Sequence, residues 1–551
     1  MSKSRFFKIL MIAFFILGSS YHGHTCTNVL VSKGASADGS VMISYLADAG
    51  GFMDPLYFYP GGAYEPGDSI DIYSWDTGEF LGKIAQAEQT YKVIGNMNEH
   101  QVAIGETTFG GRSELSEPNG IIDYGSLIYL ALQRARTARE AIEIMTSLVE
   151  EYGYSSSGES FSIADKNEVW VMDFIGKGEF GDGAVWVAAR VPDGYIAAHA
   201  NQSRIRQIDF QDTENWMYAD DVVDFARERG WFGKRQSKDE FSFADIYNPL
   251  TPESLLLCEG RVWSVFRRAA PSQNFSEEYW RCVEGAEPYP LFVKPDEKID
   301  IKNMIGLVRD HFHDSPYYTA EGFDAGPYKN PYRWRPIYFN IEGDDQKYAW
   351  PRTISQPQTG FSFVSQSRNW LPDPVGGIFW YAVDDTYSNA YMPLYMGMNK
   401  APKSLATGNI VDFDWESAFW VFNLVANYAY GLYDLIIVDI QEVQQEIENR
   451  AVVMTQAVDQ AAKTLYETDI KMAEEYLTDF SVNNAEYTVD RWRELGFDIF
   501  SKYNDRYIRT EDGVRPWPEG VGYPEEFKKQ AVEERPHFFD VKWRKPGEPL
   551  H

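Results

Sequence analysis

Cys26 is the residue of this 551-residue chain whose type and position point most directly to chemistry. It is the first of only three cysteines, and it follows a stretch that has the features of a leader peptide. If the leader is removed up to Thr25, Cys26 becomes the N-terminal residue and carries both a thiol and a free α-amine. The unperturbed pKa of an α-amine is about 8, so a useful fraction is neutral near pH 7 and can accept the thiol proton. This position therefore predicts a nucleophile that carries its own base.

A nucleophile of this kind needs a carboxylate that orients the amine and donors that bind the oxyanion. Polar residues at strand ends are natural suppliers. Asp48, the pair Thr107-Thr108 and Asn201 each end a predicted strand. The commoner role of a polar residue after a strand is to form a turn. Asp48 ends the strand that is expected to pair with the strand that begins at Cys26.

Residues 1–25 have the order of features found in a secretory signal. The basic and the apolar parts are Lys3, Arg5 and Lys8, followed by Ile9–Leu17. This apolar run is too short to span a bilayer, and no later uncharged run reaches about 18 residues, so no membrane span is expected. We expect an exported protein, periplasmic or extracellular. Cleavage near Ser20 would leave a short pro-piece for the protein to remove itself, whereas lipidation of Cys26 fits the preceding Gly23-His24-Thr25 poorly.

The composition is that of a globular protein, with 44% hydrophobic and 24% charged residues. The formal net charge is −31. A uniformly acidic chain repels phosphate backbones, so nucleic acid is not expected as a partner.

The other cysteines and a histidine pair offer further chemistry. Cys258 and Cys282 lie 24 residues apart, a spacing that allows a disulfide in an oxidising compartment and leaves Cys26 free. The alternative is that all the cysteines are small buried hydrophobes. His311 and His313, next to Asp314, have the spacing of metal ligands on one face of a strand. A structural role is the alternative for them, and neither a metal nor another cofactor is expected.

Strand-like segments joined by tight turns recur as far as Ala200. Hairpins are expected at 28–46, 91–108, 161–174 and 184–200, and one long amphipathic helix is expected over 124–152. Strands joined by tight turns form antiparallel sheets. The fold class is therefore α+β rather than doubly wound α/β.

The rest of the chain is divided into three parts by its pattern. Residues 205–345 form a loop-rich insertion, 346–411 return to strands, and 412–551 form a helical C-terminal region. The domain prediction is a leader at 1–25, a core at 26–411 and this C-terminal region packed on the core. A coiled coil over 436–480 is the alternative, but polar residues interrupt its apolar positions.

Short motifs spread over most of the chain add a resemblance to this picture. They are Cys26-Thr27, Ala35–Ser40, Asn96–Glu99, Glu106–Thr108, Ala138–Ala141, Ala164–Trp170, Ala200–Gln202, Arg261–Trp263, Val308–His311, Phe363–Gln366, Trp370–Pro372 and Val383–Asp385. Together they resemble the dipeptidase A-like family of N-terminal-nucleophile (Ntn) cysteine hydrolases, which is similar to bile-salt hydrolases and penicillin V acylases. The resemblance implies a four-layer αββα sandwich with antiparallel sheets. It includes Arg309–His311 with no metal implied and so favours a structural role for His311 and His313.

The resemblance also implies roles for individual residues. It makes Cys26 the nucleophile, Asp48 the carboxylate on the adjacent strand and Asn201 an oxyanion donor. The other oxyanion position falls on Thr108, where the wider group has Asn, so its hydroxyl or backbone would have to serve. Arg261 matches a later arginine of the family.

The expected function is hydrolysis of the amide bond of short peptides, above all dipeptides with a free N-terminus, through a thioester on Cys26. Two alternatives stay open. One is the same machinery acting on an N-acyl amide such as a conjugated bile salt, and the other is a peptide-binding envelope protein that has lost turnover. Tyr45 motivates the second, because the family usually has Arg there, three residues before the Asp. The sequence leaves open the preferred side chains and the choice between a monomer and a homo-oligomer.

Overall fold

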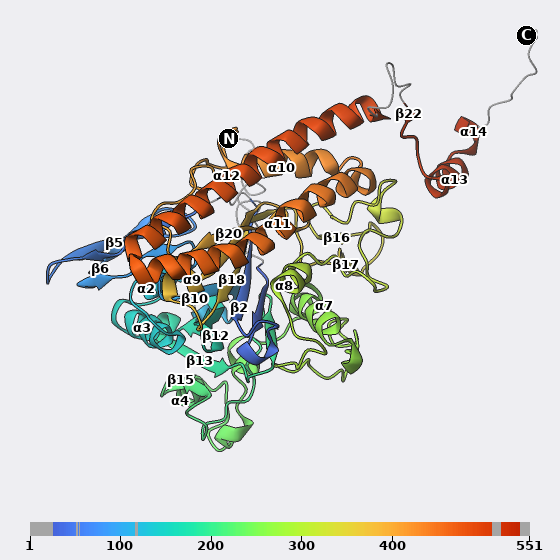
Figure 1. The fold of residues 1–551 in the computed structure, drawn as a ribbon. Helices are drawn as coiled ribbons and strands as arrows, with labels where there is room; N and C mark the ends of the chain where they lie inside the picture. The colour runs from blue at the N-terminus through green and yellow to red at the C-terminus, as the bar shows by residue number, and fades with distance from the viewer. Residues whose placement is uncertain (1–25, 51–52, 54, 116–119, 510–518, 540–551) are drawn as a thin grey trace, which may run out of the picture.

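The computed structural model describes residues 26–50, 53, 55–115, 120–509 and 519–539 (Figure 1). The leader predicted at 1–25 lies outside the described residues. Two antiparallel sheets form the centre of the molecule, and helices pack on their outer faces. The α+β class predicted from the hairpins is confirmed.

The first sheet has six strands in the order β14-β1-β2-β18-β19-β20. Their bounds are β1 Asn28–Val31, β2 Val41–Asp48, β14 Ile196–His199, β18 Thr359–Ser367, β19 Ile378–Val383 and β20 Met392–Tyr395. Every neighbouring pair is antiparallel. The central strands β1 and β2 thus pair with each other, as the sequence predicts, and β18 brings in a segment more than 300 residues away, pairing Ser365 with Ile43.

The second sheet has eight strands in the order β15-β13-β12-β11-β10-β9-β8-β3. Their bounds are β3 Phe58–Tyr59, β8 Val93–Ile94, β9 Met97–Asn98, β10 Ala103–Gly110, β11 Gly158–Ala164, β12 Val169–Gly176, β13 Ala184–Arg190 and β15 Trp216–Tyr218. Shorter two-stranded ribbons pair β4 Gly62–Ala63 with β7 Gln89–Thr90, β5 Ser69–Tyr73 with β6 Phe80–Ala85, β16 Tyr338–Asn340 with β17 Lys347–Ala349, and β21 Tyr507–Ile508 with β22 Glu519–Gly520.

The sheets lie face to face, and both of their faces are buried. Leu30 belongs to the apolar core between the sheets, together with Val171 of the second sheet. Val29 and Val31, on the other face of β1, belong to a second core beneath α7 Gly260–Ala269 and α8 Ile301–Val308. Because successive residues of a strand point to opposite faces, strands covered on both sides must be apolar at nearly every position, as Asn28–Val31 and Val169–Gly176 are.

The outer face of the second sheet is covered by α2 Tyr124–Leu132 and α3 Ala138–Tyr152. The prediction of one helix over 124–152 is wrong in its middle. The side chain of Asn98 donates to the carbonyl oxygens of Leu132 and Ala135 and closes α2. The hydroxyl of Thr137 then accepts from the N–H of Glu140 and begins α3.

The hairpin predicted at 184–200 is also wrong. β13 and β14 both exist, but they lie in different sheets. β13 pairs with β12 and β15, and β14 pairs with β1. The turn at Pro192–Gly194 carries the chain from one sheet to the other. The same turn residues serve both connections, so the local sequence does not distinguish them.

The C-terminal part consists mainly of α10 Ala418–Ala429, α11 Tyr433–Thr468 and α12 Ile470–Tyr503. In Figure 1, α11 and α12 are the long orange and red helices, and they contact each other and β20. Asp469 separates them and caps α12 through its side chain. None of the helices within the described ranges is long and apolar enough to cross a membrane. The remaining helices are α4 Val222–Glu228, α5 Phe243–Tyr247, α6 Pro252–Ser254, α9 Asp373–Gly376, α13 Glu525–Glu534 and α14 Pro536–Phe539.

Candidate active site

Three of the polar positions singled out in the sequence meet at one end of the six-stranded sheet. Cys26 lies two residues before the start of β1, Asp48 is the last residue of β2, and Asn201 lies just after β14. β1 runs antiparallel to both neighbours. The beginning of β1 therefore lies between the ends of β2 and β14. The topology alone brings a thiol, a carboxylate and an amide together, and the thiol is almost completely buried.

Arg261 of α7 binds this end of the sheet from its outer side. Its Nη1 donates to the carbonyl oxygen of Cys26 at 2.6 Å and to Oγ1 of Thr27 at 2.8 Å. Its Nη2 donates to Oδ1 of Asn201 at 2.9 Å and to the carbonyl oxygen of Ala200 at 3.0 Å. The planar guanidinium has donors in a fixed fork, so it fixes the ends of β1 and β14 relative to each other. Arg261 is completely buried and acts on the thiol through the backbone that carries it.

The carboxyl of Asp48 has a second arginine as its partner. Nη2 of Arg352 donates to Oδ2 of Asp48 at 3.0 Å, and the hydroxyl of Thr359 donates to Oδ1 at 2.7 Å. Burial raises the pKa of Asp48 to about 6, although Arg352 and Thr359 both lower it. Nη1 of Arg352 also reaches Oδ1 of Asn201 at 3.4 Å. Asp48 and Asn201 are thus joined through one cation.

Asn201 is held at both ends of its amide. Its backbone has φ of 63°, a left-handed conformation that Asn tolerates better than most residues. Its Nδ2 donates to the carbonyl oxygen of Thr108 at 2.7 Å. Thr108 therefore faces Asn201 with an acceptor, while its hydroxyl donates to Oε2 of Glu106 at 3.5 Å. The structure brings Thr108 to the site, but in this state it does not act as a second donor beside Asn201.

The thiol of Cys26 faces an acidic and phenolic environment. Its Sγ lies 3.6 Å from Oε1 of Glu106 and 3.9 Å from the hydroxyl of Tyr45, and that hydroxyl donates to the same Oε1 at 2.5 Å. Burial, with the charges of Glu106 and Asp48, raises the pKa of the thiol well above its usual value. The backbone N–H of Asp48 opposes this effect. Since the resting thiol holds its proton, attack on a carbonyl requires a base.

Sequence reasoning missed Glu106 and Arg352 as members of this site. Glu106 lies inside a predicted strand, and a charged residue among buried neighbours is the signal that could have singled it out. Arg352 lies in the connection between β17 and β18, where no sequence pattern identifies it. Tyr45 was noted only as a departure from the family, whereas its hydroxyl lies between the thiol and Glu106.

The other cysteines and the two histidines differ in their surroundings. Cys258 and Cys282 are free thiols, the first buried and the second exposed. The Sγ of Cys258 donates to the backbone oxygen of Asn201 at 3.4 Å. His311 packs against aromatic rings, and His313 contacts Asp310. Within the described ranges, no three His, Cys, Asp or Glu side chains are grouped so that they could hold a metal ion.

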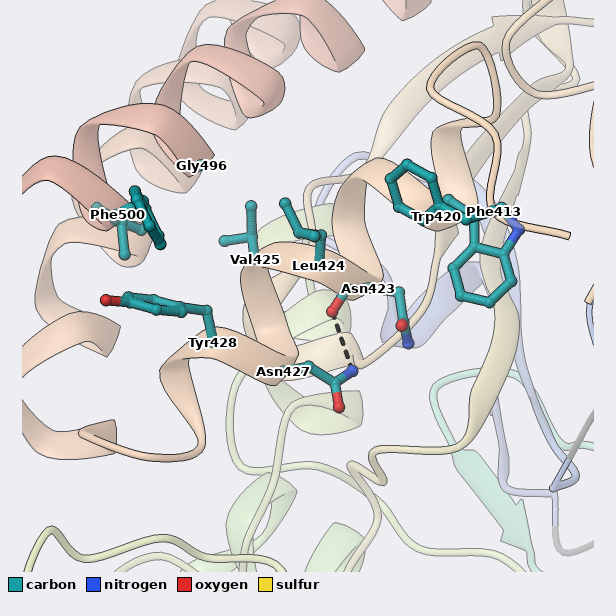
Figure 2. Close-up of a pocket in the computed structure, with 10 residues that line it drawn as sticks. Phe413, Trp420, Asn423, Leu424, Val425, Asn427, Tyr428, Gly496 and Phe500 are labelled. Carbon is teal, nitrogen blue, oxygen red and sulfur yellow. Dashed lines mark hydrogen bonds between the residues drawn. The ribbon is translucent and has the colours of Figure 1, made fainter. Parts of the chain in front are cut away.

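A separate apolar hollow of about 460 Å³ lies between α10 and α12 (Figure 2). Its lining residues are Phe413, Trp420, Asn423, Leu424, Val425, Asn427, Tyr428, Gly496, Ile499 and Phe500. The polar groups visible there include the side chain of Asn427, which donates to the backbone oxygen of Asn423. The lining contains no cysteine, carboxylate or cation, so it has no group able to attack an amide. The candidate active site is the cluster around Cys26.

Known proteins resemble this chain over most of its length. The profile of Peptidase family C69 matches residues 67–446. The chain is 25% identical to a "Probable dipeptidase" from Salmonella dublin over 395 residues, covering 68% of this chain and 81% of the relative. It is 24% identical to "Dipeptidase A" from Lactobacillus helveticus, covering 73% and 81%, and 23% identical to "Probable dipeptidase A" from Streptococcus pyogenes serotype M3 (strain SSI-1), covering 88% and 100%.

The profile match includes Thr108, Asn201 and Arg261 and begins after Cys26 and Asp48. It nevertheless covers well over half of the chain and both central sheets in large part. The dipeptidase A-like resemblance read from the motifs is confirmed, and the chain belongs to peptidase family C69.

Proposed function

We propose that this protein is a cysteine dipeptidase that hydrolyses the amide bond of short peptides with Cys26 as its nucleophile. The dipeptidase names of the relatives support the substrate class. The two stacked antiparallel sheets with helices on both outer faces support the finer fold proposal, a four-layer αββα Ntn sandwich with a helical C-terminal extension.

The first half of the reaction forms a thioester. In a chain that begins at Cys26, the α-amine takes the thiol proton as the sulfur attacks the scissile carbonyl. Asp48, at the adjacent strand end, orients the protonated amine. Asn201, whose side-chain Nδ2 donates one hydrogen to Thr108, uses its other amide hydrogen to stabilise the oxyanion. The amine then returns the proton to the leaving nitrogen, and the C–N bond breaks.

The second half releases the acyl group. A water molecule gives a proton to the α-amine and attacks the thioester carbonyl. The C–S bond breaks, and the sulfur recovers its proton from the amine. The product is the free carboxylate of the first residue. These steps consume one water molecule and need no reactant besides it and the peptide.

The observation that carries the proposal is the fork of Arg261, which binds the backbone oxygen of Cys26 and the side chain of Asn201 with one guanidinium. A buried cation that ties the residue bearing the thiol to the amide of a neighbouring strand keeps nucleophile and oxyanion donor in a fixed relation. A catalytic pair requires such preorganisation.

The test begins with N-terminal sequencing of the active secreted protein, which is expected to start at Cys26. Cys26→Ala should abolish hydrolysis of a dipeptide panel, and Cys282→Ser, which changes an exposed thiol, is the matched control. Iodoacetamide should inactivate the enzyme, whereas a chelator should not. An active protein that begins upstream of Cys26, or a fully active Cys26→Ala variant, would refute the mechanism. A parallel assay with glycine-conjugated bile salts separates the dipeptidase from an N-acyl amide hydrolase.

We further propose that the protein is exported. The support is the basic and apolar pattern of residues 1–25. Fractionation of cells that express the full chain should place the mature protein outside the cytoplasm, and replacing Ile9–Leu17 by a polar segment should retain it inside. Equal distribution of both forms would contradict export.

A further inference from the structure

Two buried glutamates lie on neighbouring strands, and one of them, Glu106, contacts the thiol of the candidate nucleophile. Glu106 of β10 and Glu159 of β11 are both almost completely inaccessible to solvent. They lie on neighbouring antiparallel strands, where Thr108 is the direct partner of Glu159 and Glu106 is two residues away, on the same face of the sheet. None of the ion pairs among the residues that the structure describes involves either carboxyl.

The donors around this pair are all neutral. Glu106 accepts from the hydroxyl of Tyr45, the thiol of Cys26 and, at 3.5 Å, the hydroxyl of Thr108. Within the described part of the chain, no donor has hydrogen-bonding geometry to either carboxyl oxygen of Glu159, although the neighbouring Thr108 hydroxyl lowers the pKa of this carboxyl. Buried carboxyls are normally paired with a cation or fully hydrogen-bonded, because an uncompensated one is costly. Two buried carboxyls side by side, one of them without a well-aligned hydrogen-bond donor, therefore indicate a binding site for a cation.

From this geometry we propose that Glu106 and Glu159 form the subsite that binds the α-ammonium group of the peptide substrate. This inference rests on the proposed function and deepens it, because it selects a free N-terminus and the first peptide bond. The substrate class is an unblocked short peptide, and N-acylated peptides are excluded.

The distances fit cleavage after the first residue. In a peptide, the amino nitrogen lies about 2.5 Å from the carbonyl carbon of its own residue. A sulfur poised for attack lies about 3–3.5 Å from that carbon, and a charged N–H···O bond spans about 2.8 Å. With Oε1 of Glu106 3.6 Å from the sulfur of Cys26, these lengths close a ring through thiol, carbonyl, ammonium and carboxylate. One more residue between ammonium and carbonyl would add about 3.8 Å and break the fit.

The surroundings of the pair strengthen its preference for a cation. Burial, and then the charge of Glu106, raises the pKa of Glu159 well above its usual value. An entering ammonium reverses the second effect, so binding should favour loss of the Glu159 proton. A small aromatic pocket lies next to Tyr45 and is lined by rings that include Tyr124 and Phe361. Its walls keep the local dielectric low, which strengthens a carboxylate–ammonium contact.

Glu106 has a rival role, because a carboxyl 3.6 Å from a thiol could act as its base. The two roles predict different results. A base acts on every substrate and on small alkylating agents, whereas an ammonium subsite acts only on ligands that carry the ammonium. Removing the charge of Glu106 should also lower the thiol pKa that this charge helps to raise. In the subsite role, alkylation of Cys26 is therefore unchanged or faster in a Glu106 variant.

The experiment compares L-alanyl-L-alanine with propionyl-L-alanine, which lacks only the amino group. For the wild-type enzyme we expect kcat/KM to be about 100-fold higher for the dipeptide, the size of a lost charged hydrogen bond. Glu106→Gln should lower kcat/KM for the dipeptide about 10- to 100-fold, mainly through KM, and should lower that for propionyl-L-alanine much less. Glu159→Gln should act in the same direction. Glu143→Gln, on the exposed face of α3, is the matched control.

Each outcome decides between the roles. Equal kcat/KM for the two substrates in the wild-type enzyme, which needs no variant to fold, overturns the subsite while the dipeptidase function stands. A loss of both activities together with slower iodoacetamide alkylation in Glu106→Gln also overturns it and makes Glu106 the base. A wild-type enzyme that hydrolyses neither substrate nor any other dipeptide refutes the proposed function and, with it, the subsite.

Discussion

The pH dependence of activity offers a direct test of the Asp48–Arg352 pair. Asp48 is the carboxyl that orients the nucleophile's amine in the proposed mechanism, and its pKa is about 6. We therefore expect kcat/KM to fall below pH 6, to about a tenth of its plateau at pH 5, since kcat/KM reports the free enzyme. Replacing Arg352 with Met removes the charge 3.0 Å from the carboxylate and keeps much of the side-chain volume.

The magnitude follows from the geometry. Two unit charges 3.0 Å apart interact by about 5.5 kcal/mol at an effective dielectric constant of 20, which bounds the effect at about four pH units. Removing a cationic partner at such a distance typically raises the pKa of a carboxyl by about one to three. Arg352→Met should therefore shift the acid limb of the kcat/KM profile to higher pH by that amount. Asp48 can take up a proton to avoid a bare buried charge, so we expect the variant to fold.

The assay is kcat/KM for L-alanyl-L-alanine from pH 4.5 to 9 in the wild type, Arg352→Met and Arg352→Lys. The lysine variant retains a positive charge and should move the limb less than the methionine variant. A limb that stays in place in Arg352→Met would refute the electrostatic argument. A limb that persists near pH 6 in Asp48→Asn would show that another group is responsible.

Three further outcomes follow from the same contacts. The native pKa of Asp48 lies above its unfolded value of 3.8, so the native state binds this proton more tightly. The free energy of unfolding should therefore fall as the pH rises from about 4 to 6, by about 3 kcal/mol in total. Comparing the pH dependence of thermal unfolding in wild type and Asp48→Asn isolates this contribution. Asn201→Ala should lower kcat about 100- to 1000-fold with little effect on KM, as removal of an oxyanion donor does, and an equal loss in KM alone would argue against that role. A methyl group on Gly105 would lie 3.0 Å from Cβ of Tyr45, so Gly105→Ala should destabilise the protein by about 1–3 kcal/mol. Gly306, on α8, faces open space, so Gly306→Ala should be neutral or stabilising by up to about 1 kcal/mol. Denaturant unfolding measures the effect of both variants.

Much of the sheet structure could be predicted from local pattern. Alternating or continuous apolar runs bounded by turn residues located β1, β2, β11, β12 and β18 within a few residues. The errors occurred where a contact with a distant part of the chain decided the local structure. Asn98, distant in sequence, closes α2 and divides the long helix. The strand after Pro192–Gly194 joins the other sheet because its partner, β1, is available there.

The residues of the candidate site also differ in how far the local sequence predicted them. Cys26 and Asp48 lie on adjacent strands of one hairpin, so sequence alone predicted that they meet. Asn201 was singled out by its place after a predicted strand and by its family motif, whereas Arg261 was identified by its family motif alone.

The sequence by itself determined the α+β class, the antiparallel pairing of the first two strands and the position of the thiol, because each depends on residues close together in the chain. The tertiary structure alone decided what surrounds that thiol. Glu106, Glu159 and Arg352 come from three separate segments, and each is an ordinary charged residue in its own segment. Their chemistry arises from burial and from one another's charges, and both quantities exist only once the sheets have packed.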